Sequence, residues 1–167
     1  MWSRIKLLFG IKANAPQEPA ADLTLHLPLD PIPENAPKLA QLVVDTALRL
    51  DGVSLDYSPE SLAFVDSRVP AFREQGSTRT QVAETLFLFG CYFGEVLRKH
   101  LGGQWFTPAQ HPAGFALLAL NLGHELHANP IGKVFKLFDN GQEDSVAWLY
   151  KVLAEEMAKR TAAPGDA

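Results

Sequence analysis

Apolar residues recur every three or four positions in five stretches of the chain, the spacing that predicts amphipathic helices. These stretches are residues 37–50, 58–72, 78–101, 129–138 and 144–157. Capping residues support the bounds, because Thr78 and Gln81 have capping-box spacing and Gly52 follows the end of the first stretch. Pro70 lies inside the second pattern and has no backbone N–H, so we expect that helix to kink or end near Val69.

The third stretch is apolar on every side between residues 86 and 93, which is typical of a central helix covered all round. Gly90 and Gly94 lie four residues apart and therefore share a face. Glycine in a helix interior costs roughly 1 kcal/mol relative to alanine, so we expect a neighbouring backbone to pack closely there. Gly102 and Gly103 are expected to end this helix.

Short apolar runs predict strands at residues 104–107, 115–121 and 124–128, with a turn at Leu122-Gly123. We therefore predict an α+β fold, a single domain in which helices pack on a short three-stranded antiparallel sheet. The middle strand is apolar on both faces, with Phe115, Leu117 and Ala119 on one and Ala116, Leu118 and Leu120 on the other. One face should receive the helices. The other should be covered by another helix, by the N-terminal segment, or by a protein partner or second copy of the chain.

Proline placement divides the chain into segments. Half of the 12 prolines lie in residues 13–37, which we interpret as an extended linker because proline removes backbone donors. Within it, residues 23–27 (LTLHL) alternate like a strand that can dock on a sheet edge. The predicted organisation is therefore a short amphipathic segment at residues 1–12, the linker at 13–37, the α+β domain at 38–160 and a disordered tail at 161–167.

The segment of residues 1–12 places Trp2, Ile5 and Phe9 on one side of a short helix, flanked by Arg4 and Lys6. It starts like a signal peptide, but its apolar stretch is short and is interrupted by a lysine. Three interpretations stay open: the segment docks on the domain or a partner, is disordered, or makes weak contact with an anionic membrane. No stretch of the sequence approaches the ~20 apolar residues of a spanning helix.

Composition narrows the function classes. The 167 residues carry a formal net charge of −4, so no basic surplus supports a nucleic-acid partner. The single cysteine, Cys91, excludes an internal disulfide and a cysteine-rich zinc site, and a reducing cytoplasm is the expected compartment. Cys91 lies in mid-helix among aromatic residues, where burial blocks access, so we interpret it as a packing residue rather than a nucleophile.

Three features of the sequence are candidates for a catalytic, metal-binding or ligand-binding site. Glu95 borders the apolar part of the central helix and is either a general acid or an exposed ion-pair partner of Arg98 and Lys99; we favour the second interpretation. The HELH run at residues 124–127 lacks the HExxH spacing of a helical zinc site, and a site built from His127, Glu125 and the distant His111 or His100 is disfavoured.

The third feature is the start of the helix at residues 129–138. Asn129 and Pro130 open it and Lys133 lies in its first turn, a geometry that can receive an anion through free backbone donors. Capping by Asn129 and Pro130 explains these residues without a ligand, and we favour that interpretation.

The stretches LDYSPESLAFVD, FGCYFGEVLRKHLGG and NPIGKVFKLFDNG, in this order, resemble a family of uncharacterised bacterial domains of unknown function. The resemblance spans residues 53–155 or thereabouts and implies a compact α+β domain. It supplies no activity, substrate or catalytic residue. The matching positions that we take as a candidate surface or ligand site are Glu95, Trp105, Asn129 and Lys133.

These observations predict a small bacterial protein that acts as a non-catalytic protein-binding or regulatory module, with no catalytic residue, metal or cofactor. The alternative is a small hydrolase or ligand-binding enzyme that uses Glu95 and the helix start at Asn129 to Lys133.

Overall fold

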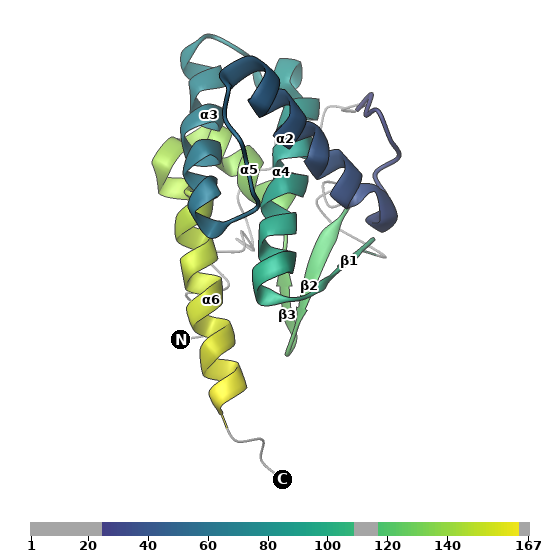
Figure 1. The fold of residues 1–167 in the computed structure, drawn as a ribbon, viewed down its shortest axis with the longest axis vertical. Helices are drawn as coiled ribbons and strands as arrows, with labels where there is room; N and C mark the ends of the chain where they lie inside the picture. The colour runs from purple at the N-terminus through teal and green to yellow at the C-terminus, as the bar shows by residue number, and fades with distance from the viewer. Residues whose placement is uncertain (1–24, 109–116, 164–167) are drawn as a thin grey trace, which may run out of the picture.

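The computed structural model describes residues 25–108 and 117–163, in which a set of helices packs against a small sheet (Figure 1). The helices are α2 (Ala36–Asp51), α3 (Leu62–Glu74), α4 (Arg79–Leu101), α5 (Pro130–Asn140) and α6 (Val146–Ala162). Short 3-10 turns lie at Pro33–Asn35, Pro59–Ser61 and Gly141–Asp144, and the strands are β1 (Gln104–Phe106), β2 (Ala119–Gly123) and β3 (Leu126–Ala128). This arrangement confirms the predicted α+β domain with a three-stranded antiparallel sheet.

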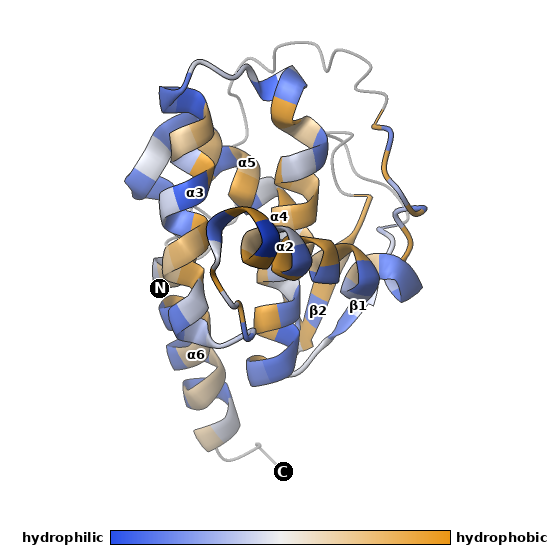
Figure 2. Ribbon diagram, turned by 45° about the horizontal axis from the view of Figure 1, so that its top comes forward, coloured by the Kyte–Doolittle hydropathy of each residue, from blue (hydrophilic) through white to orange (hydrophobic). Residues whose placement is uncertain are grey.

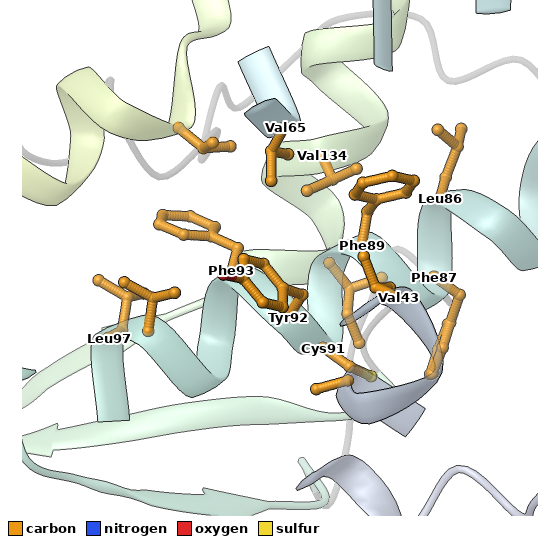
Figure 3. Packing of buried hydrophobic residues seen from close by; sticks show 14 of the residues in the cluster. Val43, Val65, Leu86, Phe87, Phe89, Cys91, Tyr92, Phe93, Leu97 and Val134 are labelled. Atoms are coloured by element: carbon orange, nitrogen blue, oxygen red, sulfur yellow. The ribbon is translucent and has the colours of Figure 1, made fainter. Parts of the chain in front are cut away.

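Helix α4 is the centre of the domain. Every residue from Phe89 to Leu97 is buried, as the apolar pattern predicts, and α2, α3, α5 and the sheet surround the helix (Figures 1 and 3). The apolar residues of α2, α3 and α4 gather on the faces that these helices turn toward one another (Figure 2). The predicted capping box opens α4, because Thr78 Oγ1 accepts from the Gln81 N–H and Gln81 Oε1 accepts from the Thr78 N–H.

The glycine face of α4 is where two neighbours pack closely. A Cβ atom on Gly90 would lie 2.5 Å from Cα of Ile131, so α5 could not approach α4 in this way with a larger residue there. A Cβ on Gly94 would overlap the indole ring of Trp105 and touch Pro130. The predicted approach of a neighbouring backbone is confirmed at Gly90, whereas the groups that pack closely on Gly94 are the side chains of Trp105 and Pro130. Close contact is the physical reason for both glycines in the helix interior.

The sheet has the order β1-β2-β3, and its register corrects two predictions. The turn between β2 and β3 lies at His124-Glu125, two residues later than expected, and both residues adopt positive φ values, of 50° and 60°. Leu120 and Leu122 are buried, but Asn121 and its partners on the neighbouring strands form a polar row on the opposite face. The partners in this row are Gln104 and His127, both exposed. The outer face is thus not uniformly apolar in its described part, because Asn121 follows Ala119 on this face and pairs with Gln104 and His127.

Proline acts differently from expectation in two places. The predicted linker over residues 13–37 gives way to helical structure at its end, because Pro33 opens a 3-10 turn and α2 begins at Ala36 with Pro37 in its first turn. Of the two outcomes predicted at Pro70, a kink or an end near Val69, the end is wrong, because helix α3 continues through Pro70 to Glu74. The carbonyl that Pro70 leaves without a helical donor is that of residue 66, and Gln142 Nε2 donates to this oxygen at 2.8 Å.

The ends of the described chain also differ from the prediction. Leu25, His26 and Leu27 belong to no strand, although the two leucines pack against the hydrophobic core. Helix α6 runs to Ala162, two residues into the segment predicted as a tail. The amphipathic segment predicted at residues 1–12 lies outside the described residues.

Candidate functional site

Glu95 and Trp105, two of the four predicted site residues, lie together between α4 and β1. The Glu95 side chain is buried, with 1% of the residue exposed, and both of its carboxylate oxygens accept hydrogen bonds. Arg98 donates from Nε to Oε1 and from Nη2 to Oε2, both at 2.9 Å, and Trp105 Nε1 donates to Oε1 at 2.8 Å. The predicted pairing with Arg98 is confirmed, whereas Lys99 lies over the Tyr57 ring. The predicted exposure of Glu95 is wrong, because the Trp105 indole covers this part of α4.

The local sequence explains how the indole reaches this carboxylate. Gly102 and Gly103 follow α4 with φ values of 78° and 113°, a region that favours glycine, and they turn the chain from the end of the helix into β1, which runs beside β2 (Figure 1). Trp105 then pairs with Leu120 on the inner face of the sheet. Because Gly94 has no side chain, the indole ring occupies the space beside it and reaches Glu95 one residue further along α4.

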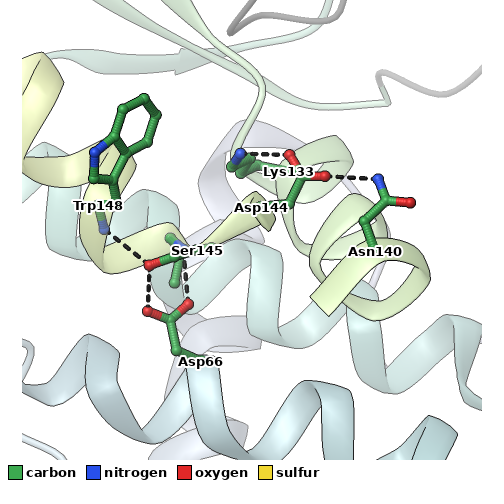
Figure 4. Close-up of polar contacts among 7 residues, drawn as sticks. Asp66, Lys133, Asn140, Asp144, Ser145 and Trp148 are labelled. Carbon is green, nitrogen blue, oxygen red and sulfur yellow. Dashed lines mark hydrogen bonds and ion pairs between the residues drawn. The ribbon is translucent and has the colours of Figure 1, made fainter. Parts of the chain in front are cut away.

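Asn129 and Lys133, the other two predicted site residues, have partners of their own around α5, and Figure 4 shows those of Lys133. Asn129 Oδ1 accepts from the Gly132 N–H at 2.8 Å, so the predicted cap is confirmed. Lys133 is buried, with 5% exposed, and its Nζ lies 2.7 Å from Oδ1 of Asp144, whose other oxygen accepts from Asn140. Burial favours a raised pKa for Asp144, but the hydrogen bonds from Lys133 and Asn140 outweigh it and lower this pKa.

The structure therefore forms two clusters rather than one site. Glu95 bonds to side chains of α4 and β1, whereas Lys133 bonds to the 3-10 turn that follows α5. Among the described residues, neither a hydrogen bond nor an ion pair joins Glu95 to Asn129 or Lys133. The two clusters are nevertheless neighbours, because the Trp105 indole and the Pro130 ring at the start of α5 both lie beside Gly94.

A third buried charge, Asp66 on α3, was missed by the sequence analysis (Figure 4). Its carboxylate accepts from Ser145 Oγ at 2.6 Å and from the backbone N–H groups of Val146 at 2.7 Å and Ala147 at 3.3 Å. These two N–H groups lie in the first turn of α6, where backbone donors lack helical acceptors and an anion is stabilised by the helix dipole. Asp66 thus fixes the start of α6 on α3. Pro70, four residues later, explains only why the Asp66 backbone carbonyl is left for Gln142, and no local pattern in the sequence marks the Asp66 carboxylate as buried.

Tyr92 is a second polar group that the sequence analysis treated as packing. Its hydroxyl accepts from the Tyr57 N–H at 3.1 Å and lies 2.6 Å from Ser61 Oγ, which itself donates to the Ser58 carbonyl. Since the Ser61 proton is used in that bond, Tyr92 donates to Ser61. The Tyr57 ring stacks on Tyr92 with 4.9 Å between centroids, and burial, then the charge of Glu95, raises the pKa of Tyr57 to about 12.

Cys91 is buried in the core, in agreement with its interpretation as a packing residue (Figure 3). Burial, and then the negative charge of Glu95, raises the pKa of the Cys91 thiol to about 12. The thiolate needed for nucleophilic attack is therefore disfavoured near neutral pH.

The residues of the HELH run diverge in the structure. His124 and Glu125 form the turn between β2 and β3, and His127 lies on the outer sheet face beside the ring of Phe106. His100 Nε2 lies 2.9 Å from the Tyr57 carbonyl. Across residues 25–108 and 117–163, no three side chains of histidine, cysteine, aspartate and glutamate group as metal ligands. His111 lies outside the described residues.

Comparison of the chain with protein-family models, curated proteins and solved structures gives no match. Of the helices in the described part of the chain, none has the length and apolar character needed to cross a membrane.

Proposed function

We propose that the protein is a small protein-binding or regulatory module without a catalytic site of its own. The main support for this proposal is that each candidate polar side chain forms a hydrogen bond or an ion pair with another group of the same domain. Both oxygens of Glu95 accept hydrogen bonds, Lys133 pairs with Asp144, and Asn129 caps α5. A general acid or an anion-binding group needs a free atom that faces substrate, and these contacts occupy such atoms.

Exposed apolar side chains on the helices support a binding role. Leu48 and Leu50 near the end of α2 and Trp148 in the first turn of α6 are large apolar residues left open to solvent. Tryptophan is enriched among residues that dominate binding energy in interfaces. The outer sheet face, which the sequence suggested as the apolar contact surface, supports this role less because Gln104, Asn121 and His127 cross it.

The proposal includes the resemblance to bacterial domains of unknown function and a cytoplasmic location. Support for the location is the composition, with one buried cysteine and an acidic net charge. Support for the resemblance is the placement of two of its stretches, since FGCYFGEV contains the glycine face of α4 and NPIGK forms the start of α5 against it.

Affinity capture from bacterial cells with the tagged full-length chain tests the binding role. Two variants, Leu48→Ser/Leu50→Ser and Trp148→Ala, are compared with Lys151→Ala, a control on the exposed side of α6. We expect specific proteins in the wild-type and control eluates, and a loss of about tenfold with one of the two surface variants.

The binding role is contradicted if no protein is enriched, or if both surface variants capture as much as the wild type. Turnover of ester or phosphate substrates by the purified chain, abolished by Glu95→Gln in a protein that remains folded, would instead establish the enzyme interpretation.

A further inference from the structure

The segment Leu25 to Leu27 lies against the domain without joining a helix or strand. Leu25 and Leu27 are half-buried and pack against the core, whereas His26 between them is exposed. The backbone N–H of His26 donates to Oε1 of Glu84 on the first half of α4, at 2.7 Å. The segment therefore sits on α4 as an extended strap, with side chains two residues apart turned to the same surface.

The attachment of this strap is small compared with that of the helices. It consists of two partly covered leucines and one hydrogen bond to an exposed carboxylate. The next large apolar residues, Leu29 and Ile32, are exposed, so the apolar contact of the strap with the core ends at Leu27, and the chain meets the domain again at the 3-10 turn Pro33–Asn35 beside β1. A local contact of this kind opens at a lower free energy than the core elements do.

Prolines 28, 31 and 33 follow the strap and stiffen the connection to α2. Proline restricts both its own φ angle and the conformation of the residue before it, which favours an extended chain. In the structure this connection is folded into turns, since the Ile32 N–H and Asn35 Nδ2 both donate to the Asp30 carbonyl, and such a short, stiff hinge limits the directions in which a released strap can move.

We propose that Leu25–Leu27 is an exchangeable strap, and that the surface it covers on α4, around Glu84, binds the same segment of a second copy of this chain. The proposal rests on the proposed function, because it gives the binding module a site and a partner. A second copy is the partner we choose because its segment is identical to the one that already packs on this surface. Its Leu25 and Leu27 would make the same contacts with the core as the chain's own leucines make. Exchange of an identical element conserves those contacts and is a low-cost route to a dimer.

A fluorescent peptide with the sequence DLTLHLPLD, residues 22–30, tests the surface in the full-length protein. Binding is measured by anisotropy to the wild type, to Leu25→Ser/Leu27→Ser, and to the same variant with Glu84→Ala. The chain's own strap competes at a high effective concentration, so we expect the leucine variant to bind the peptide at least about tenfold more tightly than the wild type does. Glu84→Ala should weaken that binding, and a peptide with serine at both leucine positions should not bind.

Two controls keep the result interpretable. Far-UV circular dichroism and urea unfolding establish that each variant is folded, and Glu155→Ala on the exposed side of α6 serves as the matched control for Glu84→Ala. If the folded leucine variant binds the peptide no better than the wild type, the surface under the strap is not a binding site and the proposal is wrong.

Sedimentation velocity tests the choice of partner. We expect a dimer fraction of the wild type that rises with concentration and is lost in Leu25→Ser/Leu27→Ser. A wild type that stays monomeric at all concentrations overturns the second copy as occupant, even if the peptide binds. Either failure leaves the capture experiment unaffected, since that experiment reads other proteins bound at Leu48, Leu50 or Trp148.

Discussion

Glu95 and Asp66 are two buried carboxylates that the domain stabilises in different ways. Glu95 is 1% exposed and receives its hydrogen bonds from side chains, the Arg98 guanidinium and the Trp105 indole. Asp66 is 8% exposed and receives two of its three hydrogen bonds from backbone N–H groups at the start of α6. The first carboxylate joins α4 to β1, and the second joins α3 to α6.

The difference determines which substitutions each junction tolerates. Backbone donors are present whatever side chains α6 carries, so the Asp66 junction depends mainly on Asp66 itself. The Glu95 junction can be broken from any of its three side chains, and also from Gly94, which makes room for the indole. Burial of Glu95 or Asp66 is therefore not in itself evidence for catalysis, because hydrogen bonds from other residues of the domain satisfy both carboxylates.

The most disruptive test of the comparison is Gly94→Leu. The new side chain would overlap the Trp105 ring, displace the indole from Glu95 and separate β1 from α4. We expect the free energy of unfolding to fall by about 3 kcal/mol, at the upper end of overpacking effects. Urea unfolding measures the loss, and Ala158→Leu at an exposed position of α6 is the control. A Gly94→Leu protein as stable as this control would show that the close approach of Trp105 is not needed.

Asp66→Ala tests the other junction. It leaves the Ser145 hydroxyl and two N–H groups of α6 without their acceptor, and we expect a loss of about 2 kcal/mol in the free energy of unfolding. Ser145→Ala should cost less than Asp66→Ala, since the backbone donors remain bound to Asp66. Chemical denaturation of the three proteins checks the order. Ser145→Ala also removes the N-cap bond in which Ser145 Oγ accepts from the Trp148 N–H. An equal loss in both variants would therefore mean that the two bonds of the Ser145 hydroxyl stabilise this junction as much as the whole Asp66 carboxylate does.

The sequence predicts the elements better than it predicts which of them meet. The capping box at Thr78, the glycine face of α4 and the cap at Asn129 depend on residues close in the chain, so local physical rules predict them. The strap contact of His26 with Glu84 joins residues 58 positions apart, and no local pattern specifies it.

The candidate site was predicted only in part for the same reason. The contact of Glu95 with Arg98 follows from helical spacing, but its burial depends on Trp105, which reaches it through the turn at Gly102. Asp66 interacts with residues about 80 positions away and looks like an ordinary polar residue of α3. Burial of a charge is decided by packing across the domain, which a single sequence does not display.

Glu95→Gln separates charge from shape at the first junction. Glutamine fills nearly the same volume and its amide oxygen can still accept from Trp105, but it loses the ion pair with Arg98. Since Arg98 is partly exposed and can turn to water, we expect a moderate loss of about 1.5 kcal/mol in urea unfolding. Arg98→Gln is the companion variant. A larger loss for Arg98→Gln than for Glu95→Gln supports the side-chain basis of this junction, because it leaves a buried carboxylate without its cation.

Gain of stability in Glu95→Gln would contradict this account. It would mean that the buried charge is retained for a reason other than stability, and the interpretation of Glu95 as a structural residue would then need the turnover experiment described above.

The smallest expected effect concerns the ionisation of the Cys91 thiol. The negative charge of Glu95 contributes to the raised pKa of this thiol, although Cys91 makes no hydrogen bond to Glu95. This pKa is raised from 9.0 to about 12 by burial first and by Glu95 second. Between these two pKa values the thiol has lost its proton in the unfolded chain but keeps it in the folded protein. Because the folded state then binds more protons, the free energy of unfolding falls as pH rises above 9.0. From about pH 8 to about pH 10 this loss should reach about 1.4 kcal/mol in the wild type, and Cys91→Ala should lack it. Urea unfolding at both pH values measures the difference between the two proteins, which removes the contribution of lysines and tyrosines common to both. Identical pH dependence in the two proteins would show that Cys91 ionises in the folded state, and would contradict the burial of the thiol beside the Glu95 charge.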